Sequence, residues 1–126
     1  MTPRRGEIYW VEFDPIRGSE QGGLRPAVVV QQDLGNRHSP TTVVVAMTSR
    51  IPPKPYPFVV LAEPEETGLS SRSAINCAQV ATIQQTGPQS RLRPPPGEHE
   101  IRPIGRLSPK TLSAVDQALK YNLGLA

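Results

Sequence analysis

Short apolar runs, separated by polar segments rich in proline and glycine, make up most of the chain. Glu7 to Phe13 mixes aromatic and β-branched residues, so it predicts a β-strand, which Asp14-Pro15 ends. Ala27 to Gln31 is short and rich in valine, as expected for a buried strand. Thr42 to Met47 predicts a third strand of the same kind. The N-terminal part of the sequence therefore predicts β structure.

The middle of the chain continues this pattern. Phe58 to Ala62 predicts a fourth strand, whereas the proline-rich stretch from Ile51 to Pro57 cannot be a central strand. Ser73 to Cys77 and Gln79 to Ile83 predict two further strands, or one bent strand, and Ile101 to Ile104 predicts a last short one. We expect polar loops at 16–25, 33–41 and 84–100 and an acidic turn at 63–67.

The C-terminal segment changes to a helical period. Ser108 followed by Pro109 predicts a helix start, with a serine N-cap and a proline at the first helical position. Gly124 predicts the end of the helix. One apolar face is predicted from residues at three- and four-residue spacing: Leu112, Val115, Leu119 and Leu123. The chain is therefore expected to form one mainly β domain over residues 1–126, a small barrel of five to seven strands with a C-terminal α-helix.

Composition agrees with this fold and excludes some classes of protein. The chain has 15 prolines and 10 glycines, which is too many for a helical bundle, while the regular apolar runs argue against general disorder. Cys77 is the single cysteine, so an internal disulfide is excluded, and we expect this side chain to be a small buried hydrophobe. No apolar segment follows the two arginines of residues 1–6, so we do not expect a secretory signal there, and no apolar run approaches the ~20 residues needed to span a membrane. We expect a cytoplasmic protein.

Charge alone gives only a weak indication of function. The formal net charge is +3 and the pI is about 9.4. A mild excess of basic residues permits a polyanionic partner such as a nucleic acid without establishing one.

The loop before the second strand carries the first candidate chemistry. It contains three glycines together with a charge pair, a hydroxyl and an amide, from Arg17, Ser19, Glu20 and Gln21. Glycines let backbone N–H groups approach an anion closely, although this is no phosphate-binding loop of the Walker type. Loops of this length in small domains are commonly functional or flexible, and a flexible surface loop is the alternative interpretation.

Arg25 differs from the rest of the loop because it directly precedes Pro26 and a buried strand, which anchor its backbone. An anchored guanidinium can present two parallel donors to a phosphate. Thr48 and Ser49 offer hydroxyls at the end of the third predicted strand. If the second and third strands are neighbours, Arg25 and Thr48 share one cleft.

Two long blocks of the sequence resemble the MazF/PemK family of toxins, residues 5–11 (RGEIYWV) and 18–30 (GSEQGGLRPAVVV). Shorter matches follow in the same order and with similar spacing. They comprise Thr48-Ser49, Gly68-Leu69, Ser73, Gln79, Thr82-Ile83, Arg91-Leu92, Ile104 to Ser108, Val115, Ala118-Leu119 and Leu123 to Leu125. The resemblance covers nearly the whole chain, apart from a proline-rich insert at 93–100 that the family generally lacks.

The resemblance implies an SH3-like barrel (CcdB/PemK-like) and a metal-independent endoribonuclease without a cofactor. It also implies a homodimer with an RNA groove at the subunit interface, and neutralisation by a cognate antitoxin. Arg25 and Thr48 match the family's catalytic pair, and Glu20 matches the acidic residue of its loop. Ser19, Ser49 and Gln79 match positions near the scissile phosphate or the bases, and we add Gln21, Arg17 and Tyr56 as candidate RNA contacts. The insert departs from the family pattern at the rim of the groove, where it bears on the antitoxin fit and the base preference of this chain.

The implied reaction is attack of a ribose 2′-OH on the adjacent phosphorus of single-stranded RNA, which leaves a 2′,3′-cyclic phosphate and a 5′-OH. Arginine has a pKa above ~12, so Glu20 is chemically the easier base and Arg25 the better stabiliser of the phosphorane. A rival acid–base pair would be His38 and His99, which we expect to be exposed bystanders. Two alternatives of another class remain, a toxin of related fold that acts on DNA gyrase and a degenerate member that only binds antitoxin.

Overall fold

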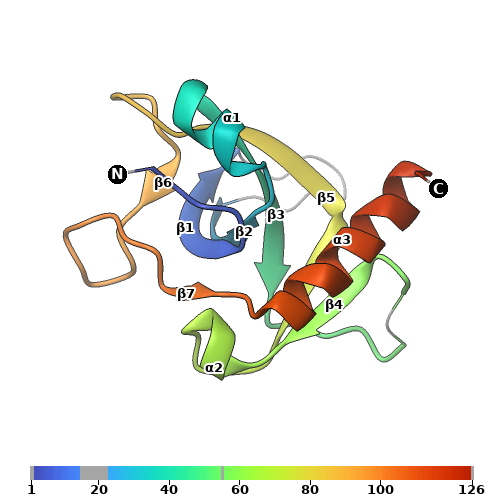
Figure 1. Cartoon of the computed structure of the whole chain (residues 1–126). Coiled ribbons are helices and arrows are strands. Elements are labelled where there is room, and N and C mark those ends of the chain that lie inside the picture. The colour runs from blue at the N-terminus through green and yellow to red at the C-terminus, as the bar shows by residue number, and fades with distance from the viewer. Residues whose placement is uncertain (1, 15–22, 55, 126) are drawn as a thin grey trace.

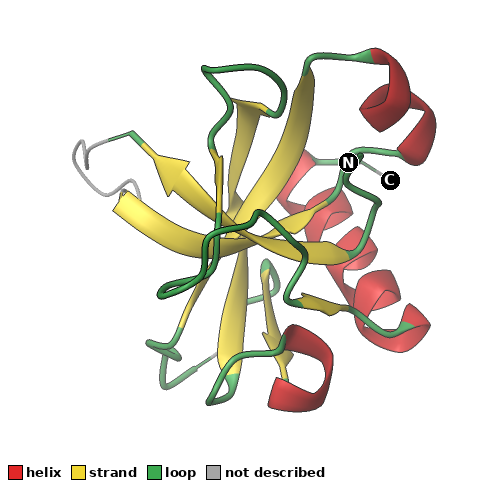
Figure 2. Cartoon of the chain, turned by 90° about the vertical axis from the view of Figure 1, so that its left-hand side faces the viewer, coloured by secondary structure: helices red, strands yellow, loops and turns green. Residues whose placement is uncertain are grey.

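The computed structural model describes residues 2–14, 23–54 and 56–125. Within these ranges, seven strands form one curled antiparallel sheet in the order β4-β5-β3-β2-β1-β6. The seventh strand, β7, pairs with the first two residues of β1. The sheet bends into a half-barrel (Figures 1 and 2). Its strands are β1 (Glu7–Phe13), β2 (Gly23–Val29), β3 (Thr41–Thr48), β4 (Val59–Ala62), β5 (Ser73–Gln84), β6 (Leu92–Arg93) and β7 (Gly105–Arg106).

The predicted mainly β fold is confirmed, and β1 has the predicted bounds. β2 was predicted to begin at Ala27, but it begins at Gly23 and pairs with β1 from Phe13 opposite Gly23 to Ile8 opposite Val28. The pairing of β2 with β3 covers only Ala27 to Val29. Pro26 therefore lies outside this pairing, and its lack of an N–H costs no hydrogen bond to β3. Arg25 therefore lies inside a strand, paired with Val11, rather than at the end of a loop.

The loop predicted at 33–41 is wrong in part, because Asp33–His38 forms the helix α1. Its sequence has no apolar periodicity, and the helix is held by polar groups instead. The Gln32 side chain accepts a hydrogen bond from the Leu34 N–H at 3.0 Å, and the buried Asn36 accepts one from the Thr42 hydroxyl at 2.6 Å. The predicted acidic turn at 63–67 likewise contains one helical turn, α2 (Pro64–Thr67).

β5 resolves the choice between two strands and one bent strand in favour of a single strand. Its pairing with β3 changes register in the middle, since Val45 lies opposite Val80 whereas Met47 lies opposite Ile75. Residues 76–79 of β5 thus face the single residue Ala46 of β3. Such bulges bend a strand and redirect its side chains, often beside a functional site.

The C-terminal region agrees with the prediction in its helix and differs in its strands. The last strand was expected at 101–104, but the corresponding short strand, β7, begins one residue after this range. A further short strand, β6, lies within the proline-rich segment that was expected to be a loop. α3 (Pro109–Leu123) starts and ends as predicted, with the Ser108 hydroxyl accepting from the Thr111 N–H and Gly124 in a left-handed conformation. Leu123 does not join the apolar face, because its side chain is 58% exposed. None of the described helices is long and apolar enough to cross a membrane.

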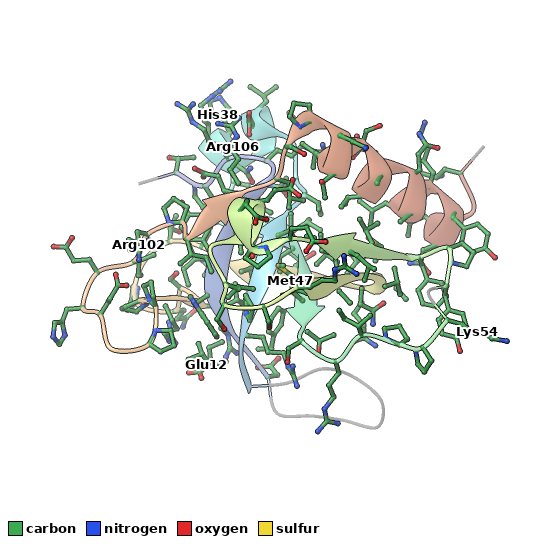
Figure 3. All side chains as sticks on the ribbon, turned by 90° about the horizontal axis from the view of Figure 1, so that it is seen from below. Glu12, His38, Met47, Lys54, Arg102 and Arg106 are labelled. Atoms are coloured by element: carbon green, nitrogen blue, oxygen red, sulfur yellow. The ribbon has the colours of Figure 1, made fainter. Side chains whose placement is uncertain are left out.

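The buried side chains gather on the two faces of the curled sheet. One cluster, between the sheet and α3, contains Ile8, Met47, Ile75 and Val115; Figure 3 shows Met47 in the interior. It also contains Cys77, whose predicted burial is confirmed; burial, with a smaller contribution from Asp116, raises the pKa of this thiol to about 12. The other cluster lies inside the half-barrel: Tyr9, Val11, Ala27, Val29, Val44, Ile83 and Leu92.

α2 and β7 meet through backbone rather than side chains. A Cβ atom on Gly105 would lie 2.2 Å from the Glu66 carbonyl oxygen, and one on Gly68 would lie 1.9 Å from the Ile104 carbonyl oxygen. No side chain fits at either position. This close contact places the Glu66 side chain at the start of α3.

Candidate functional site

Arg25 and Thr48 lie on adjacent strands and share a cleft, as the sequence predicted on the condition that these strands are neighbours. β2 and β3 pair with Ala27 opposite Ala46, and continuing this antiparallel register places Arg25 opposite Thr48. Both residues line a cleft of about 730 Å³, which we call the Arg25 cleft. Its other lining residues are Ser49 to Pro52, Tyr56, Phe58, Val59, Ala74 and Asn76.

The predicted contacts Ser49 and Tyr56 also belong to the Arg25 cleft. Tyr56 comes from the loop between β3 and β4, the loop that carries Lys54 at the edge of the molecule in Figure 3. Its side chain is 57% exposed, and its ring stacks on Phe58 with centroids 5.1 Å apart and planes 3° from parallel. Phe58 is itself half-buried against the core, so it holds the Tyr56 ring in place. A supported, exposed aromatic ring is a suitable surface for a base to stack on.

A second, smaller cavity has a volume of about 220 Å³, and we call it the Trp10 pocket. Arg25, Thr48 and Ser49 line both this pocket and the Arg25 cleft. Large aromatic side chains in strands are usually core residues, but Trp10 is only half-buried and lines this pocket. The reason is its place on β1, where its cross-strand partner is Pro26 at the end of the β2–β3 pairing. The remaining lining residues are Leu24, Pro26, Met47, Leu69, Ser70, Ser71 and Ser73.

Gln79 does not line the Arg25 cleft. It comes from the far end of the β5 bulge and borders a separate cavity of about 330 Å³ with Phe13, Asp14 and Ala46. Ala46 precedes Thr48 by two residues on β3, so this cavity lies next to the Arg25 cleft along the sheet. The four predicted loop residues, Arg17, Ser19, Glu20 and Gln21, lie outside the described residues.

The electrostatics of both cavities favour an anion. Among the described residues that line them, the charged side chains are Arg25 and Arg50, and no carboxylate is present. The Thr48 hydroxyl oxygen accepts a hydrogen bond from the Arg50 backbone N–H at 3.1 Å. This contact fixes the oxygen and leaves the hydroxyl proton to be donated into the cleft. Two guanidinium groups and an oriented hydroxyl can bind a phosphate and stabilise additional negative charge on it.

The two histidines lie elsewhere. His38 ends α1 and His99 lies in the segment after β6, and both are exposed. Neither lines the Arg25 cleft or the Trp10 pocket. The structure therefore gives no support to a histidine acid–base pair at this site.

Among the lining residues that sequence reasoning did not select as site residues are Arg50, Asn76 and Trp10. Arg50 follows Thr48-Ser49 directly and could have been included with them. Asn76 could not be identified from the sequence as a cleft residue, because it reaches the cleft through the pairing of β5 with β3 and β4, which come from distant parts of the chain. Trp10 had the signal of a core residue, since large aromatic side chains in strands are usually buried.

The comparison with protein families gives a match over residues 4–123 to the PemK-like, MazF-like toxins of type II toxin-antitoxin systems. An endoribonuclease MazF from Staphylococcus saprophyticus is 35% identical over 122 residues, which cover 97% of this chain and 92% of that protein. The crystal structure of MazF from Deinococcus radiodurans superposes with a TM-score of 0.75 at 27% identity, covering 98% of both chains. A MazE–MazF structure from the same organism gives a TM-score of 0.71 at 25% identity, with full coverage of both chains. The chain therefore belongs to the PemK-like, MazF-like family of toxins of type II toxin-antitoxin systems.

Proposed function

We propose that this chain is a single-domain endoribonuclease toxin that cleaves single-stranded RNA, including mRNA, in the cytoplasm and is neutralised by a cognate antitoxin. The observation that carries the proposal is the placement of Arg25 and Thr48 in one cleft whose described charged groups are all cationic. Its relative of 35% identity is named an endoribonuclease, and a structural neighbour contains both MazE and MazF. We further propose a homodimer, as the family resemblance implies.

The proposed reaction is transfer of the phosphorus to the 2′-oxygen of the same nucleotide. The 2′-OH loses its proton as it attacks, the P–O5′ bond breaks, and the leaving 5′-oxygen takes up a proton. Arg25 binds the non-bridging oxygens through its guanidinium, stabilises the phosphorane and gives the proton that the leaving 5′-oxygen takes up. The Thr48 hydroxyl donates a hydrogen bond to one of the non-bridging oxygens. Glu20 accepts the 2′-OH proton or orients Arg25. These residues supply the whole reaction without a metal ion or a cofactor.

The remaining candidates hold the RNA in this proposal. Ser49 and Tyr56 bind beside the scissile phosphate, since they line the same cleft as Arg25. Gln79 contacts the strand further along the sheet, in the neighbouring cavity. Ser19, Gln21 and Arg17 contact it from the loop before β2.

Product analysis of single-stranded RNA tests this function. The purified protein is incubated with a mixed-sequence transcript in excess EDTA, and the ends of the fragments are sequenced and analysed chemically. We expect cleavage that resists EDTA, with cyclic-phosphate and 5′-OH ends, and no cleavage of the matching DNA, which lacks the nucleophile. Cleavage that requires a metal would contradict the mechanism, and intact RNA together with inhibited gyrase would support the alternative toxin class.

A further inference from the structure

Asn76 is a cleft residue whose amide group already has one end engaged. Its Oδ1 accepts a hydrogen bond from the Ala78 backbone N–H at 3.1 Å. Because a backbone N–H cannot donate to an amide NH₂ group, this contact determines which end of the side chain is the oxygen. Asn76 lines the Arg25 cleft, and its Nδ2 group, which can only donate, is the end of the amide that this contact does not engage.

The backbone places Asn76 directly beside the stacked aromatic pair. Val59 lies opposite Asn76 in the pairing of β4 with β5, and the Cys77 N–H donates to the Phe58 carbonyl oxygen at 2.8 Å. Tyr56 is held in turn, since the Val59 N–H donates to its carbonyl oxygen at 2.9 Å. The aromatic pair and Asn76 thus belong to adjacent strand ends that line one cleft. A base stacked on the Tyr56 ring would lie in the same cleft as the Asn76 side chain.

An amide NH₂ group can only donate hydrogen bonds, and this distinguishes two groups of bases. At C4 of the pyrimidine ring and C6 of the purine ring, uracil and guanine carry a carbonyl oxygen, which accepts hydrogen bonds. Cytosine and adenine carry an amino group at these positions, which donates them. The Asn76 NH₂ group can bind the carbonyl, but it would face the amino group as a second donor. An unmatched donor in a partly desolvated cleft lowers affinity.

We propose that Asn76 is a specificity-determining residue, which selects a keto base, uracil or guanine, at the position stacked on Tyr56. The proposal rests on the proposed function in that it places RNA in the Arg25 cleft. The pairing of β5 makes it possible: Ala74 lies opposite Thr48, and Asn76, two residues further along the same strand, is on the same face of the sheet and lies opposite Val59 of β4.

Binding of oligonucleotides that cannot be cleaved tests this selection independently of catalysis. Fluorescence anisotropy is measured with 2′-O-methyl oligo(U) and oligo(C) of equal length and charge. We expect the wild-type protein to bind oligo(U) roughly three- to tenfold more tightly than oligo(C), the ratio of affinities that one neutral hydrogen bond produces. In Asn76→Ala this ratio of affinities falls to about one. Asn76→Asp keeps an acceptor for the Ala78 N–H but replaces the NH₂ donor with an acceptor, so it reverses the ratio in favour of oligo(C).

The control is Asn122→Asp, which makes the same change of charge at an exposed position of α3. It should leave the ratio at its wild-type value even if both affinities fall. Equal binding of the two oligonucleotides by the wild-type protein, or an unchanged ratio in Asn76→Ala and Asn76→Asp, overturns the proposal. Selective binding without any cleavage of RNA would contradict the ribonuclease function and leave the base selection supported.

Discussion

At the scale of single residues, the site depends on the backbone of Arg25 being held in β2. It pairs with Val11 of β1, and the register of β2 with β3 brings Thr48 opposite. The Thr48 hydroxyl is oriented in turn by the Arg50 N–H. Because the backbone of Arg25 is held, its guanidinium can present two donors to a phosphate beside the Thr48 hydroxyl. A lysine ammonium at the same position would offer only a single point charge.

Arg25→Lys tests this geometry. The substitution keeps the positive charge and removes the planar pair of donors, so we expect the cleavage rate to fall by about 100-fold or more, with little change in the melting temperature. Initial rates on a fluorescent RNA substrate provide the measurement. Arg37→Lys, at an exposed position of α1, is the control and should retain full activity. A near-normal rate in Arg25→Lys would show that charge alone is sufficient.

At the scale of elements, a carboxylate of α2 holds the first turn of α3. The Ser108 N–H donates to Glu66 Oε1 at 2.7 Å and the Thr111 hydroxyl donates to Oε2 at 2.9 Å. Burial by itself raises the pKa of Glu66, but the hydrogen bonds from Ser108 and Thr111 outweigh it, so the pKa lies below the ordinary value of 4.5. The stabilisation is therefore complete above pH 4.5 and is lost as the pH falls through the lowered pKa.

Glu66→Ala removes both contacts, and we expect it to lower the free energy of unfolding by about 1–2 kcal/mol at pH 7, as the loss of a helix cap does. The difference from the wild type should shrink as the pH falls below the ordinary carboxyl pKa. Urea unfolding at several pH values provides the measurement. Glu65→Ala changes an exposed neighbour on the same helical turn and should have little effect at any pH. A difference that stays constant with pH would contradict a role for the charged form.

How far the sequence predicts the structure also depends on the element. β1, α3 and the central parts of β2 and β3 could be predicted, because their hydrophobic periods and end signals are local. α1 could not, since a buried Asn36 rather than an apolar face holds it. In the site, Arg25 and Thr48 followed from their places beside valine-rich strands. Asn76 could not be predicted as a cleft residue, because the pairing that brings β5 beside β3 and β4 is not encoded in a local sequence pattern of any of these strands.

At the scale of the whole molecule, Arg5 connects segments that are far apart in the sequence. Its backbone N–H donates to Asp33 at the start of α1 at 2.8 Å, and its Nε donates to the Val30 carbonyl oxygen at 2.9 Å. Its guanidinium also forms an ion pair with Asp116 of α3. Arg5 thereby fixes the N-terminal segment against the end of β2 and ties both to α3.

Arg5→Ala should lower the free energy of unfolding by about 2 kcal/mol, because it removes a charge-assisted contact to α3 and leaves the Val30 carbonyl without this donor. Chemical denaturation with urea measures the loss. Arg4→Ala is the matched control, because Arg4 is exposed and only its backbone contacts Glu7. Equal stability of the two variants would show that the Arg5 side chain adds nothing to the connection.

The half-buried position of Trp10 has a practical consequence. It is the only tryptophan in the sequence, and it borders a pocket that Arg25, Thr48 and Ser49 also line. The indole emission of the protein therefore arises from one place, beside the proposed site of reaction. Water displaced from that pocket, or a base placed against the ring, changes the light that the whole molecule emits. The protein thus carries its own optical reporter of occupancy, with no label to be attached.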